Sequence, residues 1–321
     1  MIERNVLEGM LERNLEAQLS QGIQAMGYPH DSVCKLFRFV SIVFRKIPPE
    51  FITWKFNIVL PIGNWNYEDK QIISIGNFCE RFVSECTVIA VSESQFIIEP
   101  LDTVYTDDHV LYSYFGPYNE KICIGETQYI LNEYVDSTAC SIFAPPTYKE
   151  LDEALDFYNN RYAKDSCCLI LQNVWSDTSK QEFVAKPERF MRDSLWQCLQ
   201  NTLRNHTVKR EQNVDATHPV DIKVTWPINR NVALVEVKWL GDSGSIKYRD
   251  ARANEGAKQL IDYIASSAQE EPEKYFMGYL TVFDGRRGSS KNQYETREIN
   301  YNTDYLDLPY MKYKRLYMAE N

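Results

Sequence analysis

The alternation of apolar and polar positions divides the first half of the chain into several predicted elements. Residues 3–27 fit an amphipathic helix. Residues 33–62 are a long apolar and aromatic stretch interrupted by Pro48 and Pro49, which leaves two interpretations open: strands, or a buried helix followed by a strand. The segments "QFIIEPL" and "HVLYSYF" predict two strands joined by a turn. This region is therefore expected to be mixed α and β.

A polar segment separates this region from the rest of the chain. Before it, "PTYKELDEALDFYNNRY" (146–162) predicts a helix, and "SCCLILQNV" predicts a buried strand. Residues 176–187 are polar and favour a domain boundary. We therefore predict an α+β domain over residues 1–178 and a second domain over residues 179–321.

The second domain shows a different succession of patterns. A helix is expected from Pro187 to about residue 206, because proline is favoured in the first turn. Residues 220–240 form a ribbon of two strands, and "ARANEGAKQLIDYIASSA" predicts the next helix. The apolar strand "YFMGYLTVFD" follows. The expected order is helix, strand, strand, helix, strand.

Charged residues interrupt the apolar ribbon at three positions. If Trp226 lies opposite Ala233, then Asp221 pairs with Lys238, and Glu236 lies on the same face. The alternate positions are valine and isoleucine, which would point into a core. A register shift of one residue would destroy this convergence.

Two carboxylates that converge in a poorly hydrated site need a neutralising partner. A hard divalent cation such as Mg²⁺ provides one, because carboxylate oxygens are its preferred protein ligands. A lysine beside the cation can orient an attacking water, and the cation stabilises charge that builds on a phosphate. The set Asp221, Glu236 and Lys238 therefore suits hydrolysis of a phosphodiester.

These residues resemble the PD-(D/E)XK nuclease superfamily, which has the restriction-endonuclease-like fold. The motif reads "HPVDIKV" followed by "VEVKW", with Pro219 two positions before the aspartate instead of directly before it. The resemblance covers residues 180–285. It implies an α/β fold with an αβββαβ core in the C-terminal half, preceded by the α+β N-terminal region.

The resemblance also implies residues outside the ribbon. A carboxylate from the preceding helix often joins the metal ligands, and Glu188 is the first candidate, with Asp193 as the alternative. A glutamine on the following helix supports the site in several branches, and Gln259 and Tyr263 match this Q-x-x-x-Y pattern. The implied metal ligands are Asp221, Glu236 and Glu188, with Mg²⁺ as the cofactor and Mn²⁺ as an alternative. Lys238 would position the water.

Other residues near the ribbon have less specific interpretations. Arg249 and Arg252 precede the second helix, where they could contact phosphate or simply be solvated. Trp226 and Trp239 end the two strands and are expected to pack in the core, although stacking on bases is the alternative.

Charge and cysteine content bound the setting of the protein. The net charge of −10 belongs to the first half, whereas residues 181–321 are close to neutral and could present a basic face. The 8 cysteines form no C-x-x-C pair, which favours reduced thiols and a cytoplasmic setting over a zinc site. No apolar run is long enough to span a membrane, no signal peptide is expected, and no phosphate-binding glycine loop is present.

The expected function is that of a Mg²⁺-dependent endonuclease that cleaves DNA. The resemblance implies a role in microbial restriction or antiphage defence, with a homodimer as the expected assembly. The acidic first domain suits dimerisation, sensing of a small-molecule activator, or binding of a partner protein. Two alternatives stay open: a nucleic-acid-binding or scaffold protein of the same fold without catalysis, and a nuclease that cleaves RNA.

Overall fold

The computed structural model divides the chain into two compact units, Met1–Pro146 and Thr147–Asn321. It describes residues 30–52, 54–63, 65–79, 81–84, 86–100, 103, 109–115, 119–124, 127–131, 141, 143–144, 147–166, 168–177, 179–203, 206–213, 219–227, 230–288 and 295–318. The helix predicted over residues 3–27 lies outside these residues. The division falls earlier than the predicted boundary at 178/179, because helix α4 (Tyr148–Tyr158) packs on α6 (Glu188–Thr202) of the second unit.

The first unit is built on a seven-stranded mixed sheet with the order β2-β4-β3-β1-β5-β6-β7. Its strands β1 and β3 are parallel, and the other neighbouring strands are antiparallel. The elements are α2 (His30–Lys46), η1 (Pro49–Phe51), β1 (Phe56–Pro61), β2 (Ile73–Ser74), η2 (Ile75–Asn77), α3 (Arg81–Ser84), β3 (Cys86–Ser92), β4 (Gln95–Pro100), β5 (His109–Tyr114), β6 (Glu120–Ile124) and β7 (Thr127–Ile130).

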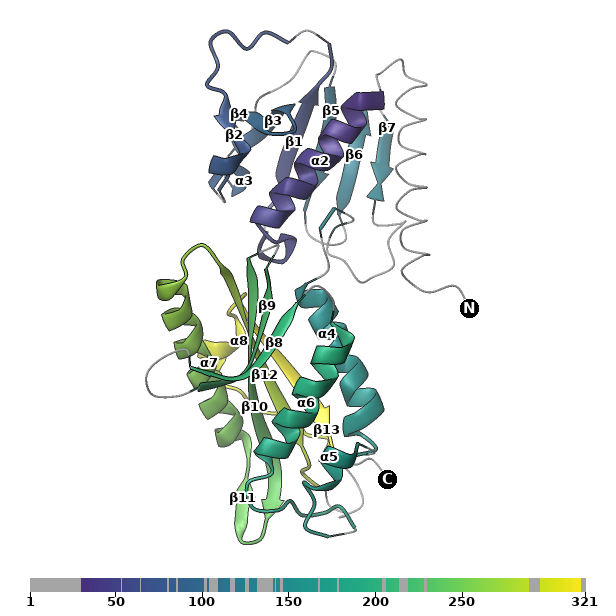
Figure 1. Ribbon diagram of the computed structural model, residues 1–321, viewed down its shortest axis with the longest axis vertical. Coiled ribbons are helices and arrows are strands. Elements are labelled where there is room, and N and C mark those ends of the chain that lie inside the picture. The colour runs from purple at the N-terminus through teal and green to yellow at the C-terminus, as the bar shows by residue number, and fades with distance from the viewer. Residues whose placement is uncertain are drawn as a thin grey trace. The chain divides into compact units, whose positions relative to one another are not determined.

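Helix α2 settles the ambiguity of residues 33–62 in favour of a helix followed by a strand. It lies along the sheet (Figure 1), and Phe39 and Phe44 are buried on its inner face. Phe44 contacts Phe56 and Tyr114 edge to face, which anchors the helix on β1 and β5. The two strands predicted from "QFIIEPL" and "HVLYSYF" are confirmed as β4 and β5.

The second unit is built on a six-stranded mixed sheet with the order β13-β12-β10-β9-β8, and β11 pairs with β10. Strands β8, β9 and β10 are antiparallel, whereas β10, β12 and β13 are parallel. Besides α4 and α6, the elements are η4 (Asn159–Ala163), α5 (Leu169–Gln172), β8 (Thr207–Asn213), β9 (Pro219–Trp226), β10 (Asn231–Ser243), β11 (Ile246–Tyr248), α7 (Asp250–Glu270), β12 (Tyr275–Asp284), α8 (Thr303–Leu306) and β13 (Met311–Tyr317).

Helices cover both faces of this sheet, so the chain as a whole is mixed α/β (Figure 1). Helix α7 packs on β10 and β12, and its Ala257 and Leu260 share a core with Leu234 and Leu280. On the other face, the hydroxyl of Tyr279 donates to the carbonyl of Tyr148 at the start of α4 (2.9 Å). Because alternate residues of a strand point to opposite faces, residues 236 and 238 of β10 lie on the α7 face with Leu234.

The helices predicted over residues 146–162, 187–206 and 251–268 are confirmed as α4 with η4, α6 and α7. The prediction of a strand from "SCCLILQNV" was wrong, because Leu169–Gln172 form one turn of helix. Leu169 is 79% exposed and Leu171 is buried, so only one side of this short helix packs against the core. None of the described helices is both long and apolar enough to cross a membrane.

Candidate active site

The candidate site lies where strand β9 separates from strand β10. Their ladder runs from Asn231↔Trp226 to Val235↔Ile222, while β9 continues to pair with β8 as far as Pro219. The predicted register, with Trp226 opposite Ala233, was therefore wrong by two residues. A shift of two residues keeps each side chain on the same face, so Asp221 still lies on the face of Glu236 and Lys238.

The side chain of Asp221 takes over a backbone role at this separation. Its Oδ2 accepts a hydrogen bond from the backbone N–H of Val237 (2.8 Å), just beyond the last paired residue of β10. The carboxylate is thereby held against β10, although the strand that carries it has turned away. This contact explains why an aspartate begins the divergent part of β9.

Glu236 and Lys238 form a buried ion pair in the middle of β10. Their exposed fractions are 4% and 3%, and the Lys238 ammonium donates to Glu236 Oε1. The other oxygen, Glu236 Oε2, is buried and has no hydrogen-bond partner among the described residues. A buried carboxylate oxygen without a partner is costly, so this pair is only half satisfied.

Helices α6 and α7 add charged side chains to the cluster. Glu188, in the first turn of α6, places Oε1 3.9 Å from the Lys238 ammonium and Oε2 3.3 Å from Arg252 Nη2 of α7. One turn further along α6, Arg192 Nη1 lies 3.5 Å from Asp221 Oδ1. The cluster therefore holds three carboxylates, Asp221, Glu236 and Glu188, among Lys238 and two arginines.

This arrangement shifts the pKa of two carboxyl groups. Burial raises the pKa of Glu236 to about 7, with a further rise from the negative charge of Asp221 and a partial offset from Lys238. Burial also raises the pKa of Asp221, while its hydrogen bond from Val237 opposes the shift. The raised pKa values show that the ionised forms of these carboxyl groups are destabilised where they lie together. Such perturbed groups are typical of functional sites.

Helix α7 approaches the cluster closely because one of its residues is glycine. A Cβ at Gly256 would lie 2.6 Å from Lys238 Cγ and 2.9 Å from Leu280 Cδ1. Only the absence of a side chain lets the helix backbone lie against the Lys238 stem. Gly256 therefore fixes the position of Lys238 from outside the strand.

The structure separates the two acids that were alternatives on α6. Glu188 contacts Lys238 and Arg252, whereas Asp193 accepts from Arg210 of β8 (3.0 Å) and lies beside Arg192. Glu188 therefore fits the cluster better than Asp193.

Gln259, the predicted supporting residue, lies on α7 one turn after Gly256, and Tyr263 follows one turn later. The Oε1 atom of Gln259 is buried without a hydrogen-bond partner in the described part of the chain. Among the described residues, no hydrogen bond joins Gln259 to Asp221, Glu236 or Lys238.

Arg192 and Gly256 were missed in the sequence. Arg192 follows Glu188 at helical spacing of four, which places both on one face of α6 and would have been a signal. Gly256 lies within a helical pattern, where a glycine lowers helix stability by about 1 kcal/mol relative to alanine. A glycine at such a position would have indicated a close packing contact.

One observation favours a hard divalent cation: Glu236 Oε2 is buried and has no hydrogen-bond partner among the described residues. Asp221 and Glu188 supply further carboxylate oxygens near it. However, within the residues that the structure describes, no group of three or more His, Cys, Asp or Glu side chains is gathered closely enough to hold a metal ion. The Lys238 ammonium instead neutralises Glu236 in this arrangement.

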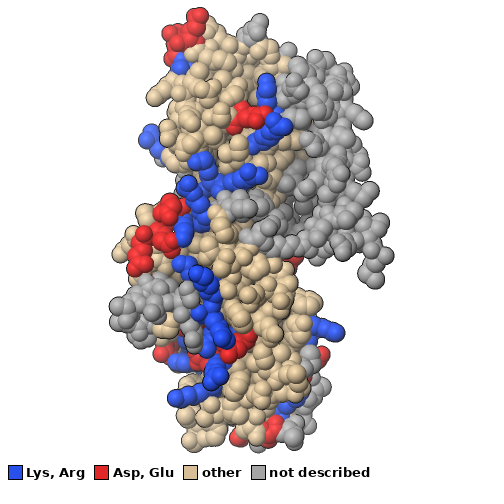
Figure 2. All heavy atoms as spheres, in the orientation of Figure 1, with Lys and Arg blue, Asp and Glu red and all other residues tan. Residues whose placement is uncertain are grey.

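Basic side chains gather beside the cluster. Figure 2 shows lysines and arginines in a column on one face of the second unit, over β8 and the beginning of α6. These elements carry Arg189 and Arg210, whose side chains are 77% and 47% exposed. The column suits a phosphate backbone that passes next to Asp221.

Comparisons with protein-family models, with curated proteins and with solved structures found no match to this chain.

Proposed function

We propose that the second unit is a restriction-endonuclease-like domain that hydrolyses DNA phosphodiester bonds with Mg²⁺. The proposal is carried by the convergence of Asp221, Glu236 and Lys238 at the point where β9 leaves β10, with one buried oxygen of Glu236 unpaired. The element order α6-β8-β9-β10-β11-α7-β12 supports it, because apart from the three-residue strand β11 it follows the αβββαβ order expected for that fold. The basic column beside the cluster favours nucleic acid as the substrate.

Asp221, Glu236 and Glu188 would hold the cation. When bound, it would make the attacking water more acidic and offset the charge that builds on the phosphate. Lys238 would donate a hydrogen bond to that water and orient it, since its stem lies against Gly256 and its ammonium lies between Glu236 and Glu188. Arg192 holds Asp221 in place, and Arg252 holds Glu188.

The setting proposed for this activity is the cytoplasm. Cys79, Cys86, Cys123, Cys168 and Cys198 are free thiols, as a reducing compartment would keep them. A homodimer, which would allow both strands to be cut, is part of the proposal on analogy alone.

Cleavage of supercoiled plasmid tests the proposal. The wild-type protein is assayed with Mg²⁺, Mn²⁺ or EDTA beside Lys238→Ala, and a single-stranded RNA is assayed in parallel. We expect cation-dependent nicking that falls by at least about 100-fold in Lys238→Ala. Lys223→Ala is the matched control, because Lys223 lies on the same face of the sheet but pairs with Glu271 at the end of α7. Equal activity in the wild type and Lys238→Ala would overturn the proposal, and cleavage of RNA alone would reassign the substrate.

The buried pair of Glu236 and Lys238 favours a second candidate, a binding or scaffold protein of the same fold. In that case Lys238 would serve as the permanent partner of Glu236, and the carboxylates would hold no metal. Thermal unfolding with and without Mg²⁺ separates the two. Stabilisation by Mg²⁺ that disappears in Asp221→Ala supports the enzyme, and the absence of any Mg²⁺ effect supports the binding protein.

A further inference from the structure

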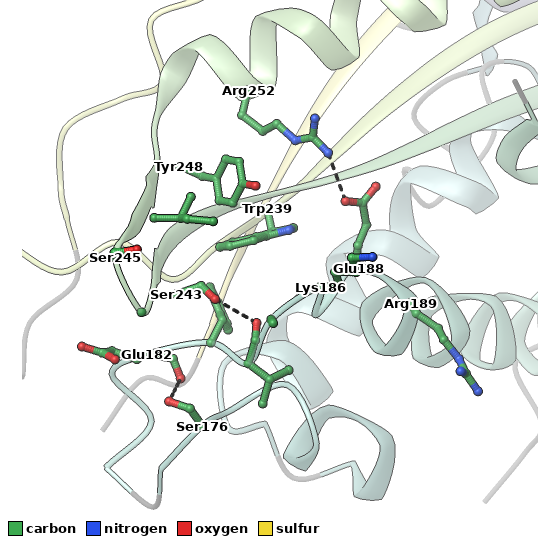
Figure 3. Close-up of a pocket in the computed structure, with 15 residues that line it drawn as sticks. Ser176, Glu182, Lys186, Glu188, Arg189, Trp239, Ser243, Ser245, Tyr248 and Arg252 are labelled. Carbon is green, nitrogen blue, oxygen red and sulfur yellow. Dashed lines mark hydrogen bonds and ion pairs between the residues drawn. The ribbon is translucent and has the colours of Figure 1, made fainter.

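A pocket of about 890 Å³ opens next to the candidate site (Figure 3). Its walls come from the segment before α6, the first turns of α6 and α7, and the hairpin of β10 and β11. Trp239, Tyr248, Arg252 and Glu188 lie together at one end of it (Figure 3). Its volume falls within the range of roughly 300–1,000 Å³ that encloses small organic ligands.

Packing contacts fix the wall of the pocket. Phe183 lies against two glycines: a Cβ would approach its ring to 2.7 Å at Gly241 and 2.4 Å at Gly285. The backbone N–H of Phe183 donates to the carbonyl of Asp242 (2.9 Å), and the Ser243 hydroxyl donates to the carbonyl of Val184 (3.1 Å). These contacts tie the segment before α6 to the hairpin and keep the space between them open.

Aromatic and cationic groups line the pocket together. The rings of Trp239 and Tyr248 meet edge to face with centroids 4.4 Å apart, and Arg252 lies over the Tyr248 ring at 5.6 Å. Trp239 is buried at the base of the pocket, whereas Tyr248 is half-buried. Lys186 and Arg189 add positive charge at the rim. A planar, apolar ring that carries a phosphate matches this lining.

Glu188 belongs both to the pocket and to the charged cluster. It lines the pocket, and its Oε1 lies 3.9 Å from the Lys238 ammonium. A nucleotide whose phosphate reached the cluster would therefore have its base, or that of its neighbour, at the pocket. The bases of a duplex are paired and stacked inside the helix, so only an unpaired base could enter.

We propose that this pocket receives an unpaired nucleobase of the substrate strand beside the cleaved phosphate, so that the substrate is single-stranded or locally unpaired at the cut. This inference rests on the proposed nuclease function. It assigns Tyr248 as a residue that selects the substrate by stacking. Arg189 and Lys186 would contact the adjoining phosphates.

Binding in EDTA, where no cleavage occurs, tests the pocket separately from catalysis. Fluorescence anisotropy gives the Kd of labelled oligothymidine and of a labelled duplex of equal length. We expect the single strand to bind more tightly than the duplex. Tyr248→Leu should weaken single-strand binding by about tenfold and leave duplex binding unchanged, because a base stacked on an aromatic ring contributes about 1–3 kcal/mol. Tyr248→Phe, which keeps the ring, should bind as the wild type does.

Tyr162→Leu is the matched control. Tyr162 is also half-buried, but it lines a separate pocket beside α6, so its loss should leave both affinities unchanged. Equal losses on the strand and the duplex, or none in Tyr248→Leu, would overturn the inference. Binding of thymidine monophosphate as tight as that of the strand would also overturn it, in favour of a free nucleotide. If the expected binding results are obtained but the protein cleaves no nucleic acid, the nuclease function is refuted and binding of an unpaired base in the pocket is not.

Discussion

Two clusters of buried charge lie on neighbouring strands of the second unit, and they differ in how completely their atoms are paired. On β10, Glu236 and Lys238 are 4% and 3% exposed. At the end of β12, Asp284 is 1% exposed, and Arg286, which follows the strand, is 4% exposed. The charged side chains of the two clusters are therefore equally buried. The number of hydrogen-bond donors to each carboxylate decides what each cluster can do.

The cluster at Asp284 is closed. Its Oδ1 accepts from Arg286 Nε (3.0 Å), and its Oδ2 accepts from Arg286 Nη2 (2.8 Å) and Arg315 Nε (2.7 Å). Arg286 Nη1 also donates to Asp250 in the first turn of α7 (2.8 Å). Both carboxylate oxygens of Asp284 are satisfied, so this cluster joins α7, β12 and β13, and Asp284 has no unpaired oxygen for a cation.

The cluster at Glu236 is open. Lys238 satisfies one oxygen of Glu236, the other has no partner among the described residues, and two more carboxylates lie nearby. Burial raises the pKa of Glu236 to about 7, and the negative charge of Asp221 raises it further. The comparison shows that buried charge marks a candidate site only where its pairing is incomplete.

The largest expected effect is on the closed cluster. Arg286→Ala should lower the free energy of unfolding by about 3–5 kcal/mol, because it removes the guanidinium that pairs with both oxygens of the buried Asp284 carboxylate and with Asp250. Urea denaturation followed by circular dichroism measures this. The control is Arg249→Ala, which removes an exposed pair with Asp242 and should cost no more than about 1 kcal/mol. Similar urea midpoints for Arg286→Ala and Arg249→Ala would show that the buried cluster contributes no more stability than an exposed ion pair.

The next effect is the pH dependence of the open cluster without divalent cations. The folded pKa of Glu236, about 7, exceeds the ordinary value of 4.5, so the folded state keeps a proton that the unfolded state has released. Stability should therefore fall as pH rises from about 4.5 to 7, by on the order of 3 kcal/mol, and then level off. Asp221, Glu188 and Lys238 face the group, and their charges contribute to the pKa of Glu236.

Glu236→Gln should remove this fall, and its advantage over the wild type should grow between pH 5 and pH 7.5. Urea midpoints across that range in EDTA measure it. Glu298→Gln is the control, because the Glu298 side chain is 87% exposed and should give a constant difference. A constant difference for Glu236→Gln as well would show that Glu236 is ionised throughout.

A smaller effect is expected where α7 meets the open cluster. Gly256→Ala should lower the free energy of unfolding by about 1–3 kcal/mol, because the new methyl group overlaps Lys238 Cγ and Leu280 Cδ1. It should also reduce plasmid nicking by displacing Lys238. Gln269→Ala, at an exposed position of the same helix, is the control. Stabilisation, as alanine gives in an ordinary helix, would contradict the close approach.

The smallest effect is expected at the rim. Arg189→Ala should change the free energy of unfolding by less than about 0.5 kcal/mol, because its side chain is 77% exposed. It should weaken DNA binding and reduce the slope of log K against log salt by about 1, the contribution of one phosphate contact. Anisotropy titrations at several salt concentrations measure this. Lys35→Ala, at an exposed position of α2 in the other unit, should leave the slope unchanged.

Local pattern predicted the longer helices and the central strands of the second unit, but not β3, β6, β8 or β13. A periodicity of 3.6 residues located α4, α6 and α7, because each helix buries one face, and apolar residues at alternate positions located the ribbon. The convergence of Asp221, Glu236 and Lys238 followed from the same alternation, and it survived a register error because the shift was two residues. The one-turn helix α5 was missed, since a short apolar run does not distinguish helix from strand.

The amino-acid sequence by itself determined which side chains share a face, because side-chain direction within a helix or strand is a local property of the backbone. Only the tertiary structure decided which elements meet. It placed Glu188 instead of Asp193 beside Lys238, and it brought Gly256 onto Lys238. It also assigned α4 to the second unit. These outcomes depend on packing between residues far apart in the chain, which no local pattern encodes.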